Sequence, residues 1–202
     1  MNNKSLLEMC QYGSYDTDKF LESKIGFTRT RSQNRHGYVE HVYSNLFEKI
    51  RNKATQVLEI GVDFGGSILL FRDYFENATI TGVDINRCEA IENRERVKSI
   101  VSDAYSKEFV NQLQDNFYDL IIDDGPHTLP SMMFFAEHYT PKLKDDGILI
   151  IEDIPSHDWL RYIASKFPEN THKYLRVYDG RKQYSRDDEL LIFLDKGDMI
   201  NG

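Results

Sequence analysis

Between Gln56 and Asp153 the sequence alternates short apolar runs with amphipathic stretches, and this pattern restricts the possible fold more than any other feature of the chain. Such alternation is typical of parallel strands joined by crossover helices. The predicted strands are QVLEI (56–60), TITGVD (79–84), KSIVSD (98–103), YDLIID (118–123) and GILIIED (147–153). We therefore expect an α/β fold in which ligands bind beyond the carboxyl ends of these strands, where acidic residues gather.

Two further segments flank this core. The loop-like sequence GFTRTRSQNRHG (26–37) precedes an amphipathic helix over residues 39–50, and this amino-terminal part is predicted to cover the cleft. Residues 156–167 predict a helix with Trp159, Ile163 and Phe167 on one face, and residues 173–179 and 189–195 predict a hairpin at the sheet edge. We expect residues 1–202 to form a single domain, with a cover (1–50), a ligand-binding core (56–153) and a helix with a hairpin (155–202).

Composition excludes several classes of protein. The formal charge of −8 disfavours a nucleic-acid partner, because an acidic surface repels phosphate backbones. Cys10 and Cys88 have no metal-ligand spacing and are too few for a disulfide framework, so we interpret them as packing residues in a reducing compartment. No stretch approaches the roughly 20 apolar residues that a membrane span needs, so we expect a cytoplasmic protein without one.

A glycine-rich turn follows the first predicted strand in VLEIGVDFGGSILLF. Gly61 and Gly65 let the backbone approach a ligand and turn sharply into a helix that begins near Ser67. Three residues separate Gly61 from Gly65, whereas a dinucleotide fingerprint reads G-x-G-x-x-G. This spacing favours an adenosyl-amino-acid pocket and disfavours a nicotinamide-dependent oxidoreductase.

Acidic residues at the strand ends complete this predicted pocket. Glu59 lies just before the glycine turn, where it could hold the α-amino group of a methionine moiety or an ordered water. Asp84 is placed to accept from both hydroxyl groups of a ribose, since a carboxylate has two acceptor oxygens. Asp103 could accept from the amino group of an adenine.

A second acidic group follows the next two strands. YDLIIDDGPHT contributes Asp123 and Asp124, and GILIIEDIP contributes Glu152 and Asp153. Four carboxylates at neighbouring strand ends repel one another unless a positive charge lies among them. Their hard oxygen atoms indicate Mg²⁺, with Mn²⁺ as a substitute.

One histidine stands out beside these carboxylates. His127 lies three residues after Asp124, beyond a glycine-proline turn that fixes its direction. Imidazole titrates near neutral pH, so His127 is predicted to be a general base that activates a hydroxyl group. His36 and His157 are weaker candidates for contact with a substrate.

These motifs together resemble those of the class I S-adenosylmethionine-dependent methyltransferases, and in particular the metal-dependent macrocin and mycinamicin sugar O-methyltransferases with their cephalosporin hydroxylase-like relatives. The resemblance spans roughly residues 12–195 and is carried by LEIGVDFGGS, GVDIN, IIDDGPHT and IIEDIP, and less closely by DTDK and HGYVEHVY. It implies a Rossmann-like fold with a seven-stranded, mostly parallel sheet, a carboxy-terminal β-hairpin and helices on both faces.

The resemblance also implies roles for individual residues. Asp124, Glu152 and Asp153 would hold the metal and His127 would be the general base, while Asp123 would contact the cofactor, or replace Asp124 as a ligand if the correspondence shifts by one residue. The donor would be S-adenosylmethionine and the product S-adenosylhomocysteine. Supporting roles would fall to Asp18, Lys19, His36 and Tyr38.

The acceptor is predicted to be a small molecule or glycan with adjacent hydroxyl groups, such as a deoxyhexose or a glycoside. A catechol or other small phenol is an alternative acceptor, and a non-catalytic methyltransferase-like subunit is an alternative of another class. The sequence leaves open whether the protein forms a homo-oligomer. Aromatic and basic residues after Pro155 could contact a sugar, although side chains of this kind are more often solvated surface. They are Trp159, Arg161, Tyr178, Arg181, Lys182 and Tyr184.

Overall fold

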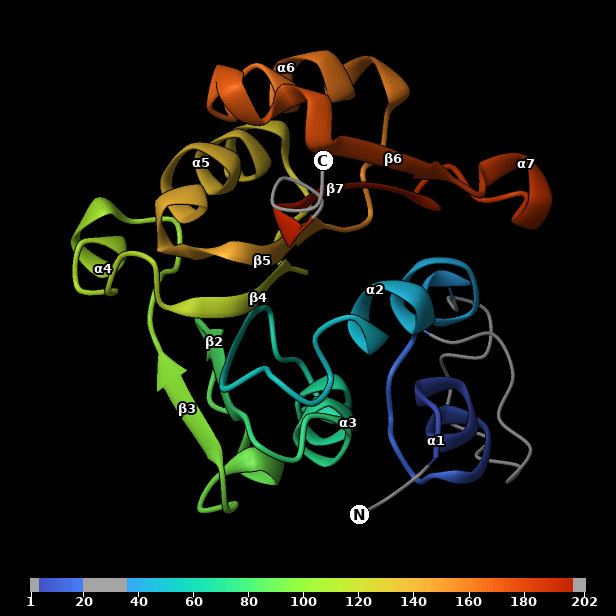
Figure 1. The fold of residues 1–202 in the computed structure, drawn as a ribbon, viewed down its shortest axis with the longest axis vertical. Coiled ribbons are helices and arrows are strands. Elements are labelled where there is room, and N and C mark those ends of the chain that lie inside the picture. Colours follow the sequence, from blue (N-terminus) through green and yellow to red (C-terminus); the bar gives the residue numbers. More distant parts are fainter. Residues whose placement is uncertain (1–3, 20–35, 198–202) are drawn as a thin grey trace.

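The computed structural model describes residues 4–19 and 36–197. Within these residues, one sheet of seven strands has the order β3-β2-β1-β4-β5-β7-β6 (Figure 1). The strands are β1 (Gln56–Ile60), β2 (Thr79–Asp84), β3 (Val97–Val101), β4 (Tyr118–Asp123), β5 (Leu143–Ile151), β6 (Leu175–Asp179) and β7 (Leu190–Asp195). The first five pair in parallel, and β7 is antiparallel to both β5 and β6. The predicted mostly parallel sheet with a carboxy-terminal hairpin is confirmed.

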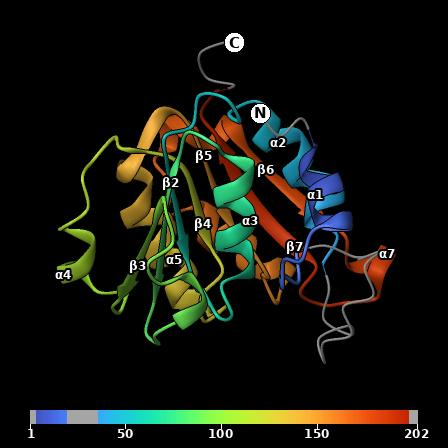
Figure 2. The same cartoon turned by 90° about the horizontal axis from the view of Figure 1, so that it is seen from below.

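Helices cover both faces of this sheet (Figures 1 and 2). One face carries α1 (Leu6–Tyr12), the π-helix η1 (Val39–Tyr43), α2 (Ser44–Glu48) and α3 (Gly66–Tyr74). The other face carries α4 (Lys107–Val110), α5 (Leu129–Tyr139) and α6 (Leu160–Ala164). Short helices complete the connections, namely η2 (Glu89–Ile91), η3 (Thr140–Lys142), η4 (His157–Trp159), η5 (Glu169–Tyr174) and α7 (Arg181–Tyr184). Over the same residues, none of the helices combines the length and apolar character needed to cross a bilayer.

Two hydrophobic cores lie on opposite sides of the sheet, because side chains alternate along each strand. In β4, Ile122 packs into the core beneath α1, α2 and α3, whereas Ile121 packs into the core beneath α5 and α6. In β5, Ile150 packs into the first of these cores and Ile151 into the second. Strands buried on both faces read as continuous apolar runs, which is why they were recognisable in the sequence.

The structure confirms the predicted bounds of β1, β2 and β4 and changes those of the other strands. Strand β3 ends at Val101, so Asp103 follows it by two residues instead of closing it. Strand β5 ends at Ile151, and Asp153 beyond it has a positive φ of 52°, which takes the chain out of the ladder. The first two residues of the predicted strand 173–179 belong instead to η5.

The predicted helix over 39–50 is present, but its first part is the π-helix η1. Both the amide and the hydroxyl group of Ser44 donate to the carbonyl oxygen of Val39, which lengthens the turn by one residue. All six apolar positions of the predicted helix are buried, namely Val39, Val42, Tyr43, Leu46, Phe47 and Ile50. Residues 26–35 of the predicted loop lie outside the described residues.

Both cysteines are free and buried, as expected of packing residues. On the carboxy-terminal side, the helix predicted over 156–167 is divided into η4 and α6. Ile163 and Phe167 are buried and Trp159 is half-buried, so the predicted apolar face packs against the sheet as expected.

Candidate active site

A cavity of about 670 Å³ lies at the carboxyl ends of β1, β2 and β4. The glycine turn, the ends of β2 and β3, the segment after β4 and the amino-terminal cover all contribute to its wall. Lining segments are 16–18, 60–64, 66–67, 83–86, 102–105 and 124–127, together with Asp153. The topology thus brings six separate parts of the chain to one side of the sheet, where open α/β folds bind their ligands.

The glycine turn requires glycine at two positions. Gly61 has a φ of 87°, and a Cβ atom there would lie 1.9 Å from the backbone oxygen of Asp124. Gly65 has a φ of 80° and caps the amino end of α3. The turn is therefore shaped both by its own backbone and by the close approach of the segment after β4.

Replacing Gly61 with alanine should reduce the free energy of unfolding by at least about 3 kcal/mol, because the methyl group meets backbone atoms in a left-handed conformation. Gly65→Ala is a matched control, since it has a similar left-handed backbone but meets a side-chain methyl group, Cγ2 of Ile91, at 2.4 Å and no backbone atom. It should cost about 1–2 kcal/mol. Urea denaturation measures both losses, and equal losses would show that contact with Asp124 is unimportant.

Two of the acidic residues predicted to bind the donor line the cavity. Asp84 accepts hydrogen bonds from the backbone amides of Val62 at 2.9 Å and Asn86 at 2.7 Å, which fixes its carboxylate beside the glycine turn. Asp103 accepts from the amide of Tyr105 at 2.9 Å. Both carboxylates are thus oriented by the backbone and retain acceptor capacity toward the cavity.

Two other predicted contacts lie behind the cavity wall. Glu59 is fully buried and accepts from the Ser67 hydroxyl group at 2.7 Å, while Asp123 is buried and accepts a short hydrogen bond from the Tyr105 hydroxyl group. Burial raises the pKa of each of the two carboxyl groups to about 7. Of the predicted donor contacts, Gly61 and Ser67 line the cavity, whereas Glu59, Gly65 and Asp123 support residues that do.

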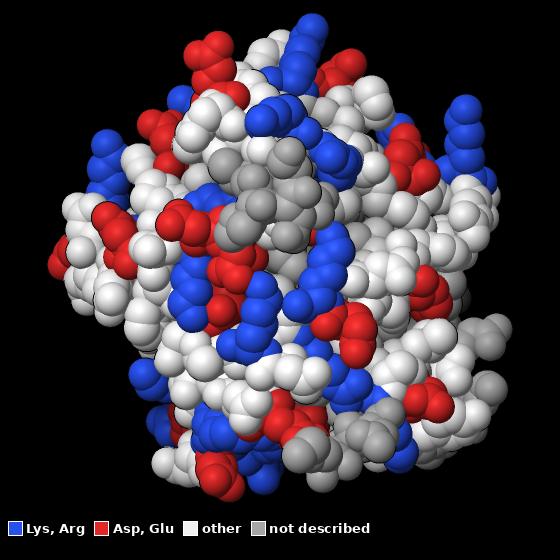
Figure 3. All heavy atoms as spheres, viewed as in Figure 1, with Lys and Arg blue, Asp and Glu red and all other residues white. Residues whose placement is uncertain are grey.

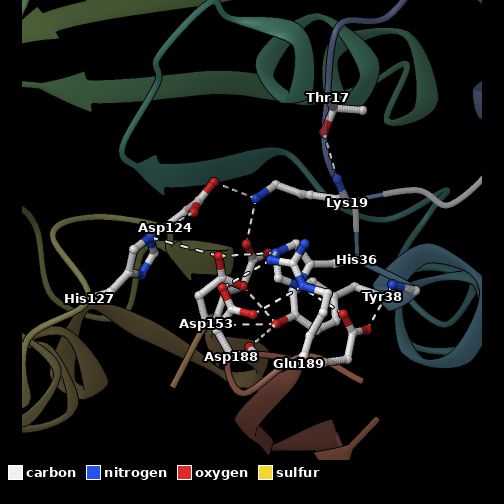
Figure 4. A network of polar contacts seen from close by, with 12 residues as sticks. Thr17, Lys19, His36, Tyr38, Asp124, His127, Asp153, Asp188 and Glu189 are labelled. Atoms are coloured by element: carbon white, nitrogen blue, oxygen red, sulfur yellow. Dashed lines mark hydrogen bonds and ion pairs between the residues drawn. The ribbon is translucent and has the colours of Figure 1, made fainter. Parts of the chain in front are cut away.

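At the other end of the cavity, Asp124, His127 and Asp153 point toward one another (Figure 4). The Nε2 atom of His127 lies 3.6 Å from Asp124 Oδ1 and 3.9 Å from Asp153 Oδ2. One ligand atom from each of the three residues falls within a span of 4.8 Å. Three polar groups from two different loops therefore converge on one small volume.

Two residues of this group have a left-handed backbone, which is uncommon without glycine. His127 has a φ of 50° and Asp153 a φ of 52°. Thr128 begins α5 immediately after His127 with a capping box that involves Ser131, and this fixes the turn. Such strained residues persist only where the surrounding structure holds them, and they are concentrated at functional sites.

Asp153 is held by a second polar network on the side of β7. It accepts from the Tyr38 hydroxyl group at 2.7 Å, and His36 Nε2 lies 3.4 Å from its other oxygen. His36 Nδ1 is in turn 2.9 Å from Glu189. Burial raises the pKa of Asp153 to about 8. The supporting role predicted for His36 and Tyr38 thus has a structural basis, namely the orientation of Asp153.

Glu152 lies apart from the three converging residues. It is buried and accepts from the ammonium group of Lys19 at 2.5 Å, and Lys19 also lies 2.6 Å from Asp124 and 3.5 Å from Glu59. The positive charge that the sequence analysis required among the carboxylates is therefore supplied in part by the chain itself. The resemblance implied only a supporting role for Lys19, which is separated from Asp124 by 105 residues of sequence.

The converging residues fit a divalent cation. Asp124 and Asp153 offer hard carboxylate oxygens, as Mg²⁺ and Mn²⁺ prefer. The Oε1 atom of Glu152 is buried and has no hydrogen-bond partner within the described residues, so one carboxylate oxygen is available for a ligand. The structure gathers Asp124 and Asp153 with His127, whereas Glu152 lies to one side beside Lys19, so the metal ligands Asp124, Glu152 and Asp153 stay a prediction.

The residues proposed to contact a sugar lie outside this cavity, as far as the described residues show. The Tyr184 hydroxyl group makes a short hydrogen bond with His41, and Arg181 forms an ion pair with Asp179 at 2.6 Å. Arg161 and Lys182 are exposed. Arg161 also donates a hydrogen bond to the Tyr162 hydroxyl group at 2.8 Å, so at least three of the six are tied to other side chains.

The outer surface carries charges of both signs. On the face shown in Figure 3, basic and acidic side chains are interspersed. Many form ion pairs, such as Lys53 with Asp146 at 2.5 Å. Among the described residues, this face shows no broad basic region of the kind that gathers phosphate backbones.

Comparison with known proteins places this site in context. Residues 58–154 match a family model described as a methyltransferase domain. The mycinamicin VI 2''-O-methyltransferase of Micromonospora griseorubida is 26% identical over 71% of this chain and 36% of its own length. An 8-demethyl-8-alpha-L-rhamnosyl tetracenomycin-C 2'-O-methyltransferase of Streptomyces olivaceus is 30% identical over 58% of this chain and 33% of its own length. The chain thus spans about a third of the length of these curated relatives.

Solved structures with the same fold include a methyltransferase from the mycinamycin biosynthetic pathway in complex with Mg, SAH and mycinamycin VI. It has a TM-score of 0.61 and 21% sequence identity, over 79% of this chain and 49% of that chain. A spermidine synthase gives a TM-score of 0.53 at 18% identity, over 73% of this chain and 55% of that chain. The predicted Rossmann-like fold and the resemblance to sugar O-methyltransferases are confirmed.

Proposed function

We propose that the protein is an S-adenosylmethionine-dependent O-methyltransferase that uses a divalent metal and acts on a hydroxyl group of a sugar, since residues 58–154 match a family model described as a methyltransferase domain. One observation carries the proposal. A single cavity brings the glycine turn and Asp84 together with Asp124, His127 and Asp153. A nucleoside site and a proton-accepting site therefore share one volume, as transfer between two bound substrates requires.

The donor end follows from the residues that line the cavity. Asp84 would accept from the ribose hydroxyl groups, and Asp103 would accept from the adenine amino group. Gly61 and the amino end of α3 would lie beside the methionine part, where the absence of a side chain permits close approach. Glu59 and Asp123 would support this wall from behind through Ser67 and Tyr105.

His127 would accept the proton of the acceptor hydroxyl group. Burial lowers the pKa of His127, so its imidazole is unprotonated at neutral pH and able to act as a base. The acceptor oxygen then bonds to the methyl carbon as the carbon–sulfur bond breaks, and the sulfonium becomes a neutral thioether.

Asp124, Glu152 and Asp153 would hold a divalent cation beside this base. When bound, such a cation lowers the pKa of a coordinated hydroxyl group. Tyr38 and His36 would keep Asp153 in the orientation that binding requires. The relatives' names support a sugar acceptor, and SAH and Mg in the mycinamycin pathway enzyme support the donor and the metal.

The proposal is tested by incubating the protein with labelled S-adenosylmethionine and a panel of deoxysugar glycosides and catechols. We expect label to pass to a glycoside, to be suppressed by EDTA and to be restored by Mg²⁺. Transfer to catechols alone would overturn the sugar acceptor and keep the reaction type. Binding of S-adenosylhomocysteine without transfer to any acceptor would favour a non-catalytic subunit.

A further inference from the structure

Lys19 is the described basic residue that the amino-terminal cover inserts among the carboxylates of the site (Figure 4). Its ammonium group lies 2.5 Å from Glu152 and 2.6 Å from Asp124, and its side chain is 2% exposed. Glu59 is 3.5 Å away. Glu59 lies near the end of β1, and Asp124 and Glu152 follow the adjacent strands β4 and β5, so Lys19 lies at the carboxyl ends of three neighbouring strands. The carboxylates raise its pKa well above the usual value despite burial, and the ammonium group is therefore charged.

The backbone around Lys19 is tied to η1. The carbonyl oxygen of Lys19 accepts from the Val39 amide at 3.0 Å, and that of Asp18 accepts from the His36 amide at 2.7 Å. The Lys19 amide lies 3.3 Å from the Thr17 hydroxyl oxygen. The ammonium group is thus delivered by a fixed segment and is not the end of a surface lysine that happens to reach the site.

Charge around this ammonium group is incompletely balanced. Glu59, Asp124 and Glu152 carry three carboxylates against the single charge of Lys19. Lys19 contacts Oδ2 of Asp124 and Oε2 of Glu152, while Oε1 of Glu152 is buried without a hydrogen-bond partner within the described residues. The site therefore attracts further positive charge, although Lys19 already occupies one oxygen of each of two predicted metal ligands.

A divalent cation and Lys19 would share the same two carboxyl groups. Lys19 contacts one oxygen of each and leaves Oδ1 of Asp124 and Oε1 of Glu152 to a cation. A cation bound to those oxygens would lie close to the ammonium group, which repels it.

We propose that Lys19 is a built-in competitor of the divalent cation. It neutralises Asp124 and Glu152 when metal is absent, and it weakens metal binding because its charge repels the cation. The amino-terminal cover, which positions Lys19, thereby sets the metal affinity of the site. This inference rests on the metal site of the proposed function, but it concerns binding and not turnover.

The test compares Mn²⁺ binding by the wild type and K19M, measured by titration with detection of free Mn²⁺ by electron paramagnetic resonance. We expect K19M to bind Mn²⁺ at least about tenfold more tightly, because a nearby repulsive charge is removed. K19R retains the charge and should stay within a few-fold of the wild type. K144M is a matched control, since Lys144 lies 2.9 Å from the buried Asp119 at the opposite ends of the strands.

Thermal melting supplies a second measurement. K19M leaves buried carboxylates without their partner, so it should melt below the wild type in EDTA and gain more from Mg²⁺ than the wild type does. A K19M protein that folds only with Mg²⁺ would support the proposal in the same way. A K19M protein that remains unfolded with Mg²⁺ would overturn it, because a replaceable charge permits rescue by the metal.

The outcomes also separate this inference from the proposed function. Equal or weaker Mn²⁺ binding by folded K19M would overturn the role of Lys19 alone. Absence of Mn²⁺ binding by both the wild type and K19M would overturn the proposed metal dependence together with the competition.

Discussion

Replacing His127 with alanine is expected to lower methyl transfer by about 10³-fold, within the range that loss of a general base produces. The acceptor hydroxyl group would then have no base within reach at this end of the cavity. Donor binding should change less than about twofold, because Asp84 and the glycine turn lie at the other end. Single-turnover transfer and calorimetric binding of S-adenosylhomocysteine separate the two effects.

His157→Ala is a suitable control, since His157 also follows a carboxylate pair in the sequence but is exposed. It should retain wild-type activity.

The structure also allows His127 to be a metal ligand, because its Nε2 atom belongs to the same cluster as Asp124 and Asp153. Binding of Mn²⁺ that is lost together with activity in His127→Ala would assign His127 to the metal instead of to the proton.

The pH dependence of the wild type offers a separate test of the base. Burial lowers the pKa of His127 below its ordinary value of 6.5, so the unprotonated form should predominate at pH 7. With saturating Mg²⁺, which would hold Asp153 in its carboxylate form, the rate of transfer at saturating acceptor should be level near pH 7 and should fall as the pH drops through the lowered pKa of His127. A rate that rises steeply above pH 7 would point to another proton acceptor.

Local sequence patterns were sufficient to predict the strands and the donor end of the site. Buried parallel strands are continuous apolar runs, and the turn between Gly61 and Ser67 lies within a few residues of β1. Asp84 lies at the end of its strand and lines the cavity beside the glycine turn, and its contact with the ribose stays a prediction. These features depend on short stretches of chain, so their spacing is visible without a structure.

Features that depend on distant parts of the chain were not predictable in the same way. The side chain of Glu59 could have faced either the cavity or the interior, and its contacts with Ser67 and Lys19 decided for the interior. Lys19 reaches Glu152 across 133 residues of sequence. The only available signal was electrostatic. A cluster of four acidic residues demands a counter-charge, and that demand can be met by a lysine as well as by a metal.

Replacing Asp153 with asparagine should weaken Mn²⁺ binding by at least about 100-fold and reduce methyl transfer accordingly, since even outer-shell partners of a metal contribute 10- to 100-fold. Asparagine accommodates the left-handed backbone at φ 52° and can still accept from Tyr38, so the fold should be retained. Asp153→Ala should lose both binding and stability, because alanine is strained there.

The contrast between these two variants separates charge from backbone strain at Asp153. Asp158→Asn removes an exposed carboxylate five residues away and should leave Mn²⁺ binding unchanged. If Asp153→Asn kept wild-type affinity for Mn²⁺, the left-handed conformation and the hydrogen bond from Tyr38 would have to serve another purpose. The positive φ values of His127 and Asp153 would then be explained by contact with the acceptor and not with a cation.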